Sequence, residues 1–232
     1  MHAFYLPDLS GKLVLDAEES AHAIKVMRKR EGDTIALTDG KGRLAEAIIT
    51  KAHTRGCELQ LSGEITQAAQ RPYRIHIAIS PTKNLDRMEW MVEKCTELGV
   101  DKISFLLCDN SERKVLKQDR LLKKAVSAMK QSGNFYLPEL SELISFQDFL
   151  KAESEAAQKM IAYVDEAHPH HLKDLLEKES SYCILIGPEG DFSPEEITQA
   201  REAGFSPISL GSSRLRTETA GIAACHICHL IN

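Results

Sequence analysis

Two glycine-containing segments near the C-terminus carry residue types that can bind a ligand. The apolar run Ile184–Ile186 is followed by Gly187-Pro-Glu-Gly190, and the run Ile208–Leu210 is followed by Gly211. Each run has the length of a buried strand. A glycine directly after a strand allows a tight turn and lets backbone groups approach a ligand closely. One such junction alone is most often a plain turn, whereas two in the same half of a domain favour a binding site.

Charged residues follow the second glycine and precede an apolar helical stretch. Arg214, Arg216 and Glu218 lie in this segment. A cation can stabilise negative charge that develops on a substrate, and a carboxylate can accept a proton. The alternative for Arg216 is a structural ion pair with Glu189 or Glu218. The alternative for Glu218 is an acid that favours the start of the helix. The residues alone leave these alternatives open.

Sequence motifs for several other chemistries are missing. There is no G-x-G-x-x-G fingerprint after the first strand and no G-x-x-x-x-G-K-[ST], which disfavours dinucleotide and P-loop nucleotide binding. No H-E-x-x-H, paired C-x-x-C or G-x-S-x-G motif is present, so we expect neither a metal site nor a serine hydrolase. The remaining hypothesis is a nucleoside-type cofactor held by backbone groups of the glycine turns.

Two clusters of histidine and cysteine have simpler interpretations than cofactor binding. Cys225-His-Ile-Cys-His229 fits the C-x-x-C-H pattern of haem attachment. It lies in an amphipathic helix in which Cys225 and Cys228 share a face with Ile222, so we predict packing or a dimer interface. A second cluster contains His168, His170 and His171 and is expected to be a solvated helix start rather than a metal site.

The elements that position the glycine turns alternate between strands and helices. Strands are expected at Ile75–Ser80, Ile103–Leu107, Met160–Val164, Cys183–Ile186 and Pro207–Leu210. Helices are expected at Leu85–Cys95 with Gly99 as a stop, at Leu121–Met129, from Pro169, after a capping box at Ser193–Glu196, and at Thr217–Ile231. Such alternation predicts an α/β fold with a mostly parallel sheet and helices on both faces. Open parallel sheets bind ligands at the carboxyl ends of their strands, where both glycine turns fall.

The first 70 residues have a different pattern. A short helix is expected at Ser20–Lys29, with Ala21, Ile24 and Met27 on its apolar side. Strands are expected at Thr34–Thr38 and Leu44–Thr50 around the turn Asp39–Gly42, and at Cys57–Leu61. We therefore predict a small, mainly β domain over residues 1–70. A polar link that contains Pro72 separates it from a second domain over residues 73–232.

The composition limits the possible partners. The chain has 232 residues and a formal net charge of -5, which argues against binding to DNA or RNA through bulk charge. Its 6 cysteines are dispersed, as is typical of reduced thiols. The N-terminus does not resemble a signal peptide, and no apolar run reaches the roughly 18 residues of a membrane span. We expect a soluble cytoplasmic protein with no membrane partner.

Several motifs together resemble one enzyme family. Gly187-Pro-Glu-Gly-Asp-Phe-Ser193, Leu210-Gly211 and Leu215-Arg-Thr-Glu-Thr-Ala220 are similar to the signature of the 16S rRNA (uracil-N3)-methyltransferases of the RsmE type, in the SPOUT superfamily. Asp86–Val100 resembles the first helix of that family's catalytic domain. The sequence departs from the family at Asp191, where glycine is common, and at Asn134, near where a basic residue often stands.

The resemblance implies a fold, a cofactor and partners. It implies a SPOUT-type trefoil-knotted parallel sheet with an N-terminal PUA-like β-barrel that binds RNA. It also implies S-adenosylmethionine as the cofactor, a homodimer, and methylation of a uridine at N3 in the 16S rRNA of the 30S subunit. Rival hypotheses are a SPOUT enzyme that acts on another nucleotide or a ribose hydroxyl, and an RNA-binding or ribosome-assembly protein without catalysis.

The resemblance also implies roles for individual residues. Arg216 and Glu218 are the catalytic candidates. The cofactor-binding candidates are Val164, Ile186, Gly187, Glu189, Gly190, Leu210, Gly211, Leu215, Thr217, Thr219 and Ala220. The RNA-binding candidates are Lys25, Arg28, Lys29, Arg30, Arg87, Lys94, Arg113 and Lys130. A solvated helix face is the alternative for the basic run in the small domain, because short runs of charge are usually solvated.

Overall fold

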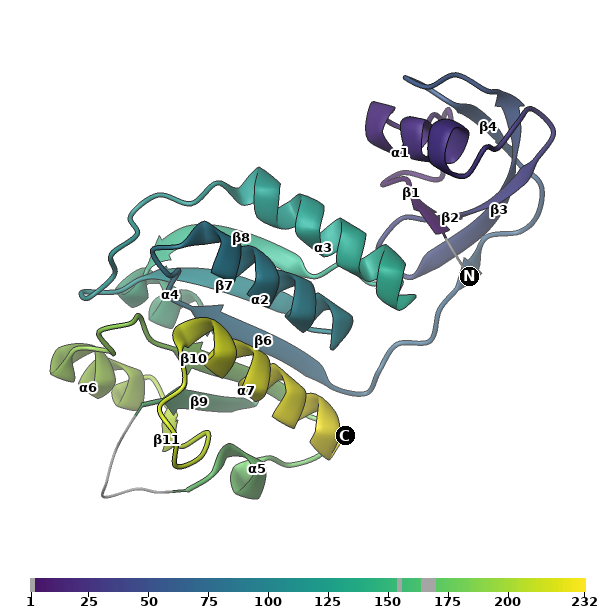
Figure 1. The fold of residues 1–232 in the computed structure, drawn as a ribbon. Helices are drawn as coiled ribbons and strands as arrows, with labels where there is room; N and C mark the ends of the chain where they lie inside the picture. The colour runs from purple at the N-terminus through teal and green to yellow at the C-terminus, as the bar shows by residue number, and fades with distance from the viewer. Residues whose placement is uncertain (1–2, 154–155, 164–169) are drawn as a thin grey trace. The chain divides into compact units, whose positions relative to one another are not determined.

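The computed structural model describes residues 3–153, 156–163 and 170–232, which form two compact units. The small unit combines Met1–Gln70 with Val126–Leu137. The large unit combines Arg71–Ala125 with Pro138–Asn232. Helix α3 (Gln118–Ser132) contributes residues to both units, so each unit is built from two separate stretches of sequence (Figure 1).

A five-stranded sheet forms the core of the small unit. Its strands are β1 (Ala3–Tyr5), β2 (Thr34–Thr38), β3 (Arg43–Lys51), β4 (Glu58–Leu61) and β5 (Thr66–Gln67). The order is β1-β2-β3-β4, and β5 also pairs with β3. The hairpin predicted between β2 and β3 is confirmed. In its turn, the Asp39 carboxylate accepts hydrogen bonds from the backbone N–H groups of Lys41 and Arg43 and pairs with the Arg43 guanidinium at 2.6 Å.

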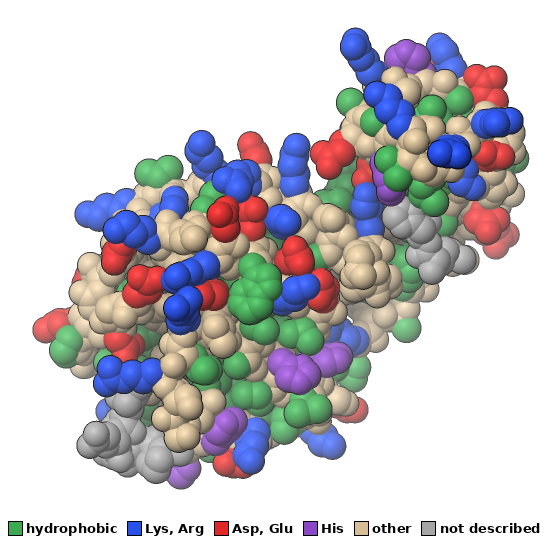
Figure 2. Space-filling model, in the orientation of Figure 1, with side chains coloured by type: hydrophobic (Ala, Val, Ile, Leu, Met, Phe, Trp, Pro, Cys, Tyr) green, Lys and Arg blue, Asp and Glu red, His purple; other side chains and the backbone are tan. Residues whose placement is uncertain are grey.

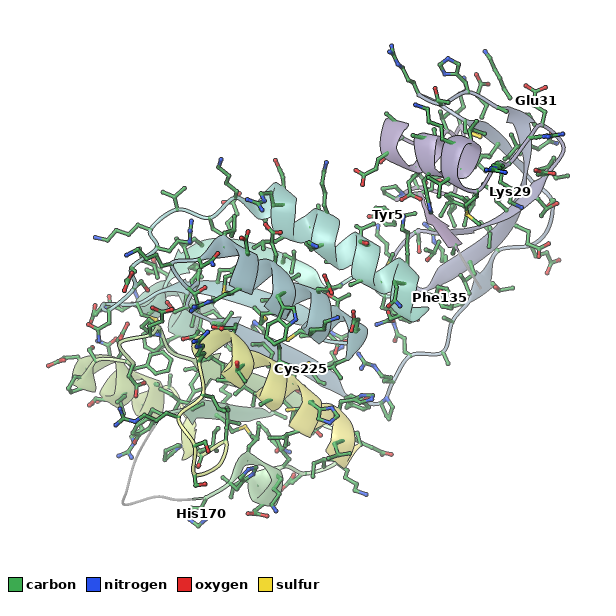
Figure 3. All side chains as sticks on the ribbon, viewed as in Figure 1. Tyr5, Lys29, Glu31, Phe135, His170 and Cys225 are labelled. Atoms are coloured by element: carbon green, nitrogen blue, oxygen red, sulfur yellow. The ribbon has the colours of Figure 1, made fainter. Side chains whose placement is uncertain are left out.

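The second stretch of the small unit packs against this hairpin. The Gly42 N–H donates to the carbonyl oxygen of Phe135 at 2.9 Å, and the Tyr136 hydroxyl donates to the carbonyl oxygen of Ala68 at 2.8 Å. Gly40 has a φ of 72°, and a Cβ there would lie 3.0 Å from the Leu137 Cβ. Glycine is therefore required both for the turn and for this close approach. Tyr5 and Phe135 are labelled in Figure 3.

The N-terminal helix differs from its predicted bounds. An α-helix, α1 (Ala17–Ala21), begins after Asp16, whose carboxylate accepts from the Glu19 N–H at 2.8 Å. It continues as a π-helix, η1 (His22–Val26). The Met27 N–H donates to His22 at 3.0 Å, and this wider turn leaves the Met27 side chain exposed. The predicted bounds of Ser20–Lys29 were therefore wrong, and Met27, which was expected on the apolar side with Ala21 and Ile24, is exposed.

Six parallel strands form the sheet of the large unit. They are β6 (Arg74–Ile79), β7 (Lys102–Leu107), β8 (Glu139–Ser145), β9 (Gln158–Ala162), β10 (Ser181–Ile186) and β11 (Ser206–Ile208). The order is β11-β9-β10-β6-β7-β8, and every pairing is parallel. The predicted parallel sheet is confirmed. Strand β8 was not predicted, and the predicted end of β9 at Val164 lies outside the described residues.

Helices cover both faces of this sheet (Figure 1). Besides α3, they are α2 (Leu85–Glu97), α4 (Phe146–Ala152), α5 (Leu172–Leu175), α6 (Pro194–Glu202) and α7 (Thr217–Ile231). Helices α2 and α7 pack together on one face, and α4 packs with α6 on the other. A Cβ on Gly221 would lie 3.0 Å from the Ile79 Cδ1, so this glycine brings α7 close to β6.

Local signals in the sequence located several of these helices. Helix α7 has the predicted bounds, and α6 begins with the predicted capping box between Ser193 and Glu196. Cys225 and Cys228 are fully buried on α7, which confirms the packing interpretation of the C-x-x-C-H segment (Figure 3). Among the residues that the structure describes, no helix has both the length and the apolar character needed to cross a membrane.

Candidate active site

The first glycine turn, residues 187–190, follows the carboxyl end of β10 and is tightly packed. A Cβ on Gly187 would lie 3.1 Å from the Phe192 ring, and one on Gly190 would lie 3.2 Å from the Asn110 Cβ. The Asn110 amide donates to the carbonyl oxygens of Gly190 at 3.2 Å and of Asp191 at 3.0 Å. Gly190 therefore allows the turn to pack closely against the loop that follows β7, and Gly187 allows it to pack against the Phe192 ring.

Asp191 explains one departure from the family pattern. Its φ is 62°, a left-handed conformation in which glycine has no steric penalty. Aspartate is among the few other residues that adopt this conformation readily. Its Oδ1 accepts a hydrogen bond from the Phe192 N–H at 2.8 Å. The turn therefore keeps its shape with Asp191 in place of glycine.

The second glycine turn follows β11 and is open. Gly211 has a φ of 124°, and a Cβ there would meet no atom within 4 Å among the described residues. The preceding Ser209 pairs with His171, and its N–H donates to the carbonyl oxygen of His170 at 2.8 Å. His171 caps α5 by accepting from the Lys173 N–H, which confirms that it starts a helix, whereas His168 lies outside the described residues (Figure 3 labels His170).

An arginine on α2 pairs with an acid of the first glycine turn and with an acid at the start of α7. The Arg87 Nη1 lies 3.2 Å from the Glu189 Oε1, and its Nε lies 3.8 Å from the Glu218 Oε1. Glu218 lies in the first turn of α7 and is only 5% exposed. Its Oε2 is buried and has no hydrogen-bond partner among the described residues. Arg87, which was predicted to contact RNA, is thus the cation that neutralises both candidate acids.

Arg216 takes no part in the ion pairs of Arg87 with Glu189 and Glu218. It is the N-cap residue of α7, its side chain makes no capping hydrogen bond, and it is exposed. Among the described residues it forms no ion pair, so the structure gives no support for the structural pairing considered for Arg216. Its guanidinium is therefore available to a ligand at the N-terminus of α7, where the helix dipole also favours negative charge.

The candidate cofactor residues gather at one edge of the large unit's sheet. Ile186 ends β10 and is buried, while Leu210 and Gly211 follow β11. Thr217, Thr219 and Ala220 lie in the first turn of α7. Strand β9 lies between β10 and β11, and Val164, which follows it, lies outside the described residues. The two turns and the start of α7 therefore form a single candidate site on this edge.

Polar residues that no motif in the sequence indicated support the first glycine turn. The Ser80 N–H donates to the Ile186 carbonyl oxygen at 3.0 Å, and the Ser80 and Ser111 hydroxyls lie 2.8 Å apart. Glu196, which is buried at the start of α6, accepts from the Asp109 N–H at 3.0 Å. These polar residues have the composition of an ordinary loop, so nothing in the sequence indicates that they buttress the site.

The other predicted RNA-binding residues of the large unit have protein partners. The Arg113 guanidinium donates to the carbonyl oxygens of Thr82, Lys83 and Val115. Lys94 pairs with Glu93 and Glu97, and these hydrogen bonds raise the pKa of the ammonium group, Glu97 having the larger effect. Both side chains therefore have structural roles, and their contact with RNA stays a prediction.

In the small unit, the predicted basic residues fall into two groups. Lys130 pairs with Glu19, and the Lys29 Nζ donates to the carbonyl oxygen of Thr34 at 3.2 Å. Lys25, Arg28 and Arg30 are exposed and form no ion pair among the described residues. Arg28 has a φ of 55°, just after η1. Among the predicted RNA-binding residues of this unit, these three are available to a phosphate backbone.

Two family models match most of the chain. The model of an RNA methyltransferase domain matches residues 69–229, and the model of an RNA methyltransferase PUA domain matches residues 15–62. A probable rRNA methyltransferase from Porphyromonas gingivalis has a crystal structure with a TM-score of 0.92. It is 43% identical in sequence, over 100% of this chain and 98% of that chain.

Two further relatives carry a more specific name. A ribosomal RNA small subunit methyltransferase E from Neisseria gonorrhoeae, solved bound to S-adenosyl methionine, has a TM-score of 0.84. It is 30% identical, over 97% of this chain and 95% of that chain. The enzyme of that name from Bacillus subtilis is 27% identical, over 90% of this chain and 86% of its own length.

The parallel sheet with its glycine turns and the two matched domains define the class of this protein as an RNA methyltransferase. Within that class, the chain belongs to the ribosomal RNA small subunit methyltransferase E family.

Proposed function

We propose that this protein transfers a methyl group from S-adenosylmethionine to the N3 atom of a uridine in the 16S rRNA of the small ribosomal subunit. The observation that carries the proposal is the edge where the Gly187 and Gly211 turns and the start of α7 meet, in a chain of this family. When bound, the cofactor supplies an electrophilic methyl group. The protein must bind the cofactor, position the uridine and stabilise the negative charge that develops on the uracil.

The two turns are suited to a nucleoside-type cofactor. Backbone groups of the turns after Ile186 and Leu210 would bind its polar atoms, while the apolar side chains of these residues would pack against the adenine. Among the residues that the structure describes, Gly211 has no neighbour within 4 Å of where a Cβ would be, which leaves room for a ligand at this turn. The proposed cofactor-binding residues are Ile186, Gly187, Glu189, Gly190, Leu210, Gly211, Leu215, Thr217, Thr219 and Ala220, together with Val164.

The reaction needs a group that stabilises an anion. The N3 atom of uracil carries a proton and is a poor nucleophile until that proton leaves. Arg216 is exposed, unpaired among the described residues and placed at the N-terminus of α7. Its charge and the helix dipole would both stabilise the negative charge that develops on the uracil oxygens. Arg216 is therefore our candidate for the catalytic cation.

Glu218 is the second catalytic candidate. One carboxylate oxygen faces Arg87, and the other is buried without a hydrogen-bond partner among the described residues. Its ion pair with Arg87 and its burial hold the Glu218 carboxylate in place between α7 and α2. We therefore assign Glu218 chiefly to positioning: it fixes the start of α7, and with it Arg216.

RNA binding is assigned to both domains. We propose residues 1–70 as a PUA-like RNA-binding domain that closes into a barrel, and residues 73–232 as the methyltransferase domain. The exposed cations Lys25, Arg28 and Arg30 support phosphate contacts in the first. Phosphate contacts position RNA, whereas selection of the uridine requires that an unstacked base enter the catalytic pocket. The remaining candidates for phosphate contact are Lys29, Arg87, Lys94, Arg113 and Lys130.

The chain path supports the knot that the family resemblance implies. After β11, the Ser209 backbone pairs with His170 and Leu172, and the chain then continues through the Gly211 turn into α7. We propose that the passage of the chain from β11 through residues 209–216 into α7 makes the trefoil knot of a SPOUT domain. True knots are rare, so this passage is a strong constraint on the fold.

A homodimer is supported by exposed apolar residues on two neighbouring helices. Trp90 on α2 is 46% exposed and Leu230 on α7 is 71% exposed. In Figure 2, hydrophobic side chains gather where these two helices face the viewer. Burying this patch against a second copy would remove apolar area from water. We propose a homodimer through α2 and α7 that acts in the cytoplasm on the 30S subunit.

Mass-spectrometric mapping of small-subunit rRNA from a deletion strain tests the activity and the target together. We expect the loss of one N3-methyluridine, with recovery when the gene is restored. A methylated ribose oxygen in its place would favour the ribose-directed rival. Calorimetry with S-adenosylmethionine separates the enzyme from a non-catalytic RNA-binding protein, because the absence of binding at high concentration would exclude the enzyme hypothesis.

The role of Arg216 is tested by single-turnover methylation with Arg216→Ala. We expect a rate lowered by about 100-fold, the range seen when one charge-stabilising group is removed from an active site. Arg214→Ala is the matched control, since Arg214 is also exposed and lies two residues earlier. Cofactor affinity is measured separately. An unchanged rate for Arg216→Ala, or an equal loss for Arg214→Ala, would remove Arg216 from the mechanism.

A further inference from the structure

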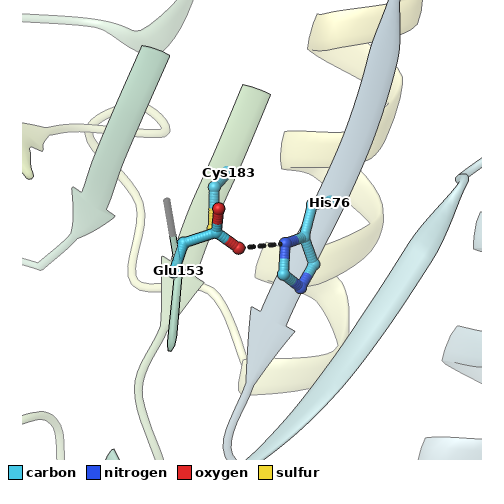
Figure 4. Close-up of side chains that lie close together, drawn as sticks. All are labelled: His76, Glu153 and Cys183. Carbon is cyan, nitrogen blue, oxygen red and sulfur yellow. Dashed lines mark ion pairs between the residues drawn. The ribbon is translucent and has the colours of Figure 1, made fainter. Parts of the chain in front are cut away.

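A cluster of three ligand-type side chains lies in the large unit, away from the glycine turns. His76 on β6, Glu153 at the end of α4 and Cys183 on β10 bring an imidazole nitrogen, a carboxylate oxygen and a thiol sulfur within 4.8 Å of one another (Figure 4). The His76 Nδ1 and the Glu153 Oε2 are 2.8 Å apart. His76 and Cys183 lie in the amino-terminal halves of their strands, on the sheet face that α4 covers.

We propose that His76, Glu153 and Cys183 form a binding site for a zinc-class divalent transition metal ion. Nitrogen, oxygen and sulfur ligands in one site match the preference of Zn²⁺ and of its spectroscopic substitute Co²⁺. They do not match Mg²⁺ or Ca²⁺, which prefer sites made of oxygen ligands alone. A neutral imidazole with one carboxylate and one thiolate also balances the charge of a divalent ion.

The distances are compatible with such an ion after a small movement. Bond lengths of about 2.0–2.3 Å in a tetrahedral site place ligand atoms about 3.4–3.7 Å apart. The three donor atoms already lie within 4.8 Å of one another, and the His76–Glu153 pair has to open from 2.8 Å by less than 1 Å. Binding of the ion would displace the proton between the Nδ1 and Oε2 atoms, and the Cys183 thiol would release its proton to solvent. No rearrangement of the strands is required.

Two of the three ligands already have the supporting contacts of a metal site. The His76 Nε2 lies 2.8 Å from the Ser104 hydroxyl, so that hydroxyl can hold the ring with its Nδ1 toward the ion. The Glu153 Oε1 accepts from the Ala156 N–H at 3.2 Å, which leaves the Oε2 toward His76. Metal-binding histidines and carboxylates are usually oriented by such partners.

A cavity supplies access and room for a fourth ligand. It has a volume of about 360 Å³ and is lined by His76, Lys102, Ser104, Ser141, Glu142 and Glu153, among others. Three protein ligands and one open position are the arrangement of zinc sites that keep a water molecule. An ion at the cluster would therefore be reachable from the cavity, both for loading and for removal by a chelator.

The same side chains also form a hydroxyl–imidazole–carboxylate chain, Ser104–His76–Glu153, as in serine hydrolases. Ser104 lies inside β7 and is 3% exposed, which does not suit a nucleophile that must attack a substrate. The next backbone donor, the Phe105 N–H, is bound to the Ser141 hydroxyl at 3.1 Å and is not available to stabilise an oxyanion. Ser104 therefore fits the role of a support for His76 better than that of a nucleophile.

The test is metal binding by the full chain, with no dependence on methyl transfer. Purified protein is stripped with a chelator, dialysed and titrated with Co²⁺. We expect one ion per chain and an absorption band from thiolate-to-cobalt charge transfer, which Zn²⁺ then abolishes by displacement. A titration without this band would overturn the proposal, because a surface-bound ion has no thiolate ligand.

Two variants and one control test the Cys183 ligand and the support that Ser104 gives to His76. Cys183→Ser should abolish the charge-transfer band and weaken binding by at least about 100-fold, since removal of a supporting group alone weakens metal binding about 10–100-fold. Ser104→Ala should retain the band and weaken binding by about 10-fold. Cys57→Ser, at a buried thiol of the small unit, should change neither. A band that persists in Cys183→Ser would overturn the assignment.

The proposal can still be tested if Cys183→Ser fails to fold. If Cys183→Ser does not give a native circular dichroism spectrum, the wild-type cobalt spectrum and the Ser104→Ala titration decide. Absence of the band in the wild type, or unchanged affinity in a folded Ser104→Ala, would refute the site. Methylation activity is not a readout here, so failure of the metal site and failure of the proposed function remain distinguishable.

Discussion

Arg87→Gln should destabilise the large unit because it leaves a buried carboxylate without its cation. The Arg87 Nε and the Glu218 Oε1 lie 3.8 Å apart. At an effective dielectric constant of about 20, two unit charges at this distance attract by about 4 kcal/mol, which is an upper bound. The Arg87 side chain is 36% exposed, so solvent screens this attraction. We therefore expect the free energy of unfolding to fall by about 1–3 kcal/mol.

The partner substitution should cost less. Glu218→Gln removes the buried charge itself, while Arg87 keeps its exposed pair with Glu189 at 3.2 Å. Such an exposed pair contributes under about 1 kcal/mol. The double variant should therefore lose less free energy of unfolding than the sum of the losses of the two single variants. We expect a coupling energy of about 1–2 kcal/mol from the double-mutant cycle.

Urea unfolding at neutral pH and fixed protein concentration measures the free energy of unfolding of the wild type, the two single variants and the double variant. The chain has a single tryptophan, Trp90, which lies on the same helix as Arg87, so its fluorescence reports on α2. A fixed concentration is required because association shifts the apparent stability. Additive losses, or a larger loss for Glu218→Gln than for Arg87→Gln, would refute the argument that Arg87 compensates a buried charge.

Three further predictions concern single positions. Ser193→Ala removes the capping hydroxyl of α6 and should lower the free energy of urea unfolding by about 1 kcal/mol. Gly211→Ala and Gly204→Ala both place a side chain at positive φ and should each cost about 1–3 kcal/mol, but calorimetry should detect weaker S-adenosylmethionine binding only for Gly211→Ala. Burial tends to raise the pKa of Asp39, but hydrogen bonds, first from the Arg43 side chain, outweigh it and lower the pKa below 3.8. Asp39 therefore adds stability above that pH, and Asp39→Asn should flatten the loss of unfolding free energy that wild type shows as the pH falls below 3.8.

Local signals in the sequence were sufficient for much of the fold. Helix α7 was located from its apolar periodicity, and α6 from the Ser193 capping box. Strand β8 was missed because Glu139–Ser145 alternates weakly and contains one β-branched residue, Ile144. Its position at the edge of the sheet is set by pairing with β7, which is information that a local pattern lacks.

The site was only partly predictable. Glycines after two apolar runs identified the two turns, because the need for a tight turn is a local property. The ion pairs of Arg87 depend on how α2 packs beside α7, so no spacing in the sequence indicates them. The side chains of Ser80 and Ser111 meet only because β6 and β7 are neighbours in the sheet. Residue types can be read from a sequence, whereas the partners of a charge require the fold.

The buried cysteines give each unit an internal reporter of its own opening. All 6 thiols are free and buried, with Cys57 in the small unit and the other five in the large unit. Burial raises the pKa of the Cys57 thiol, and a protonated, inaccessible thiol reacts slowly with alkylating reagents. Under native conditions, the labelling rate of each thiol therefore measures how often its surroundings open. Mass spectrometry of the labelled peptides would give separate opening free energies for the two units in a protein without added probes.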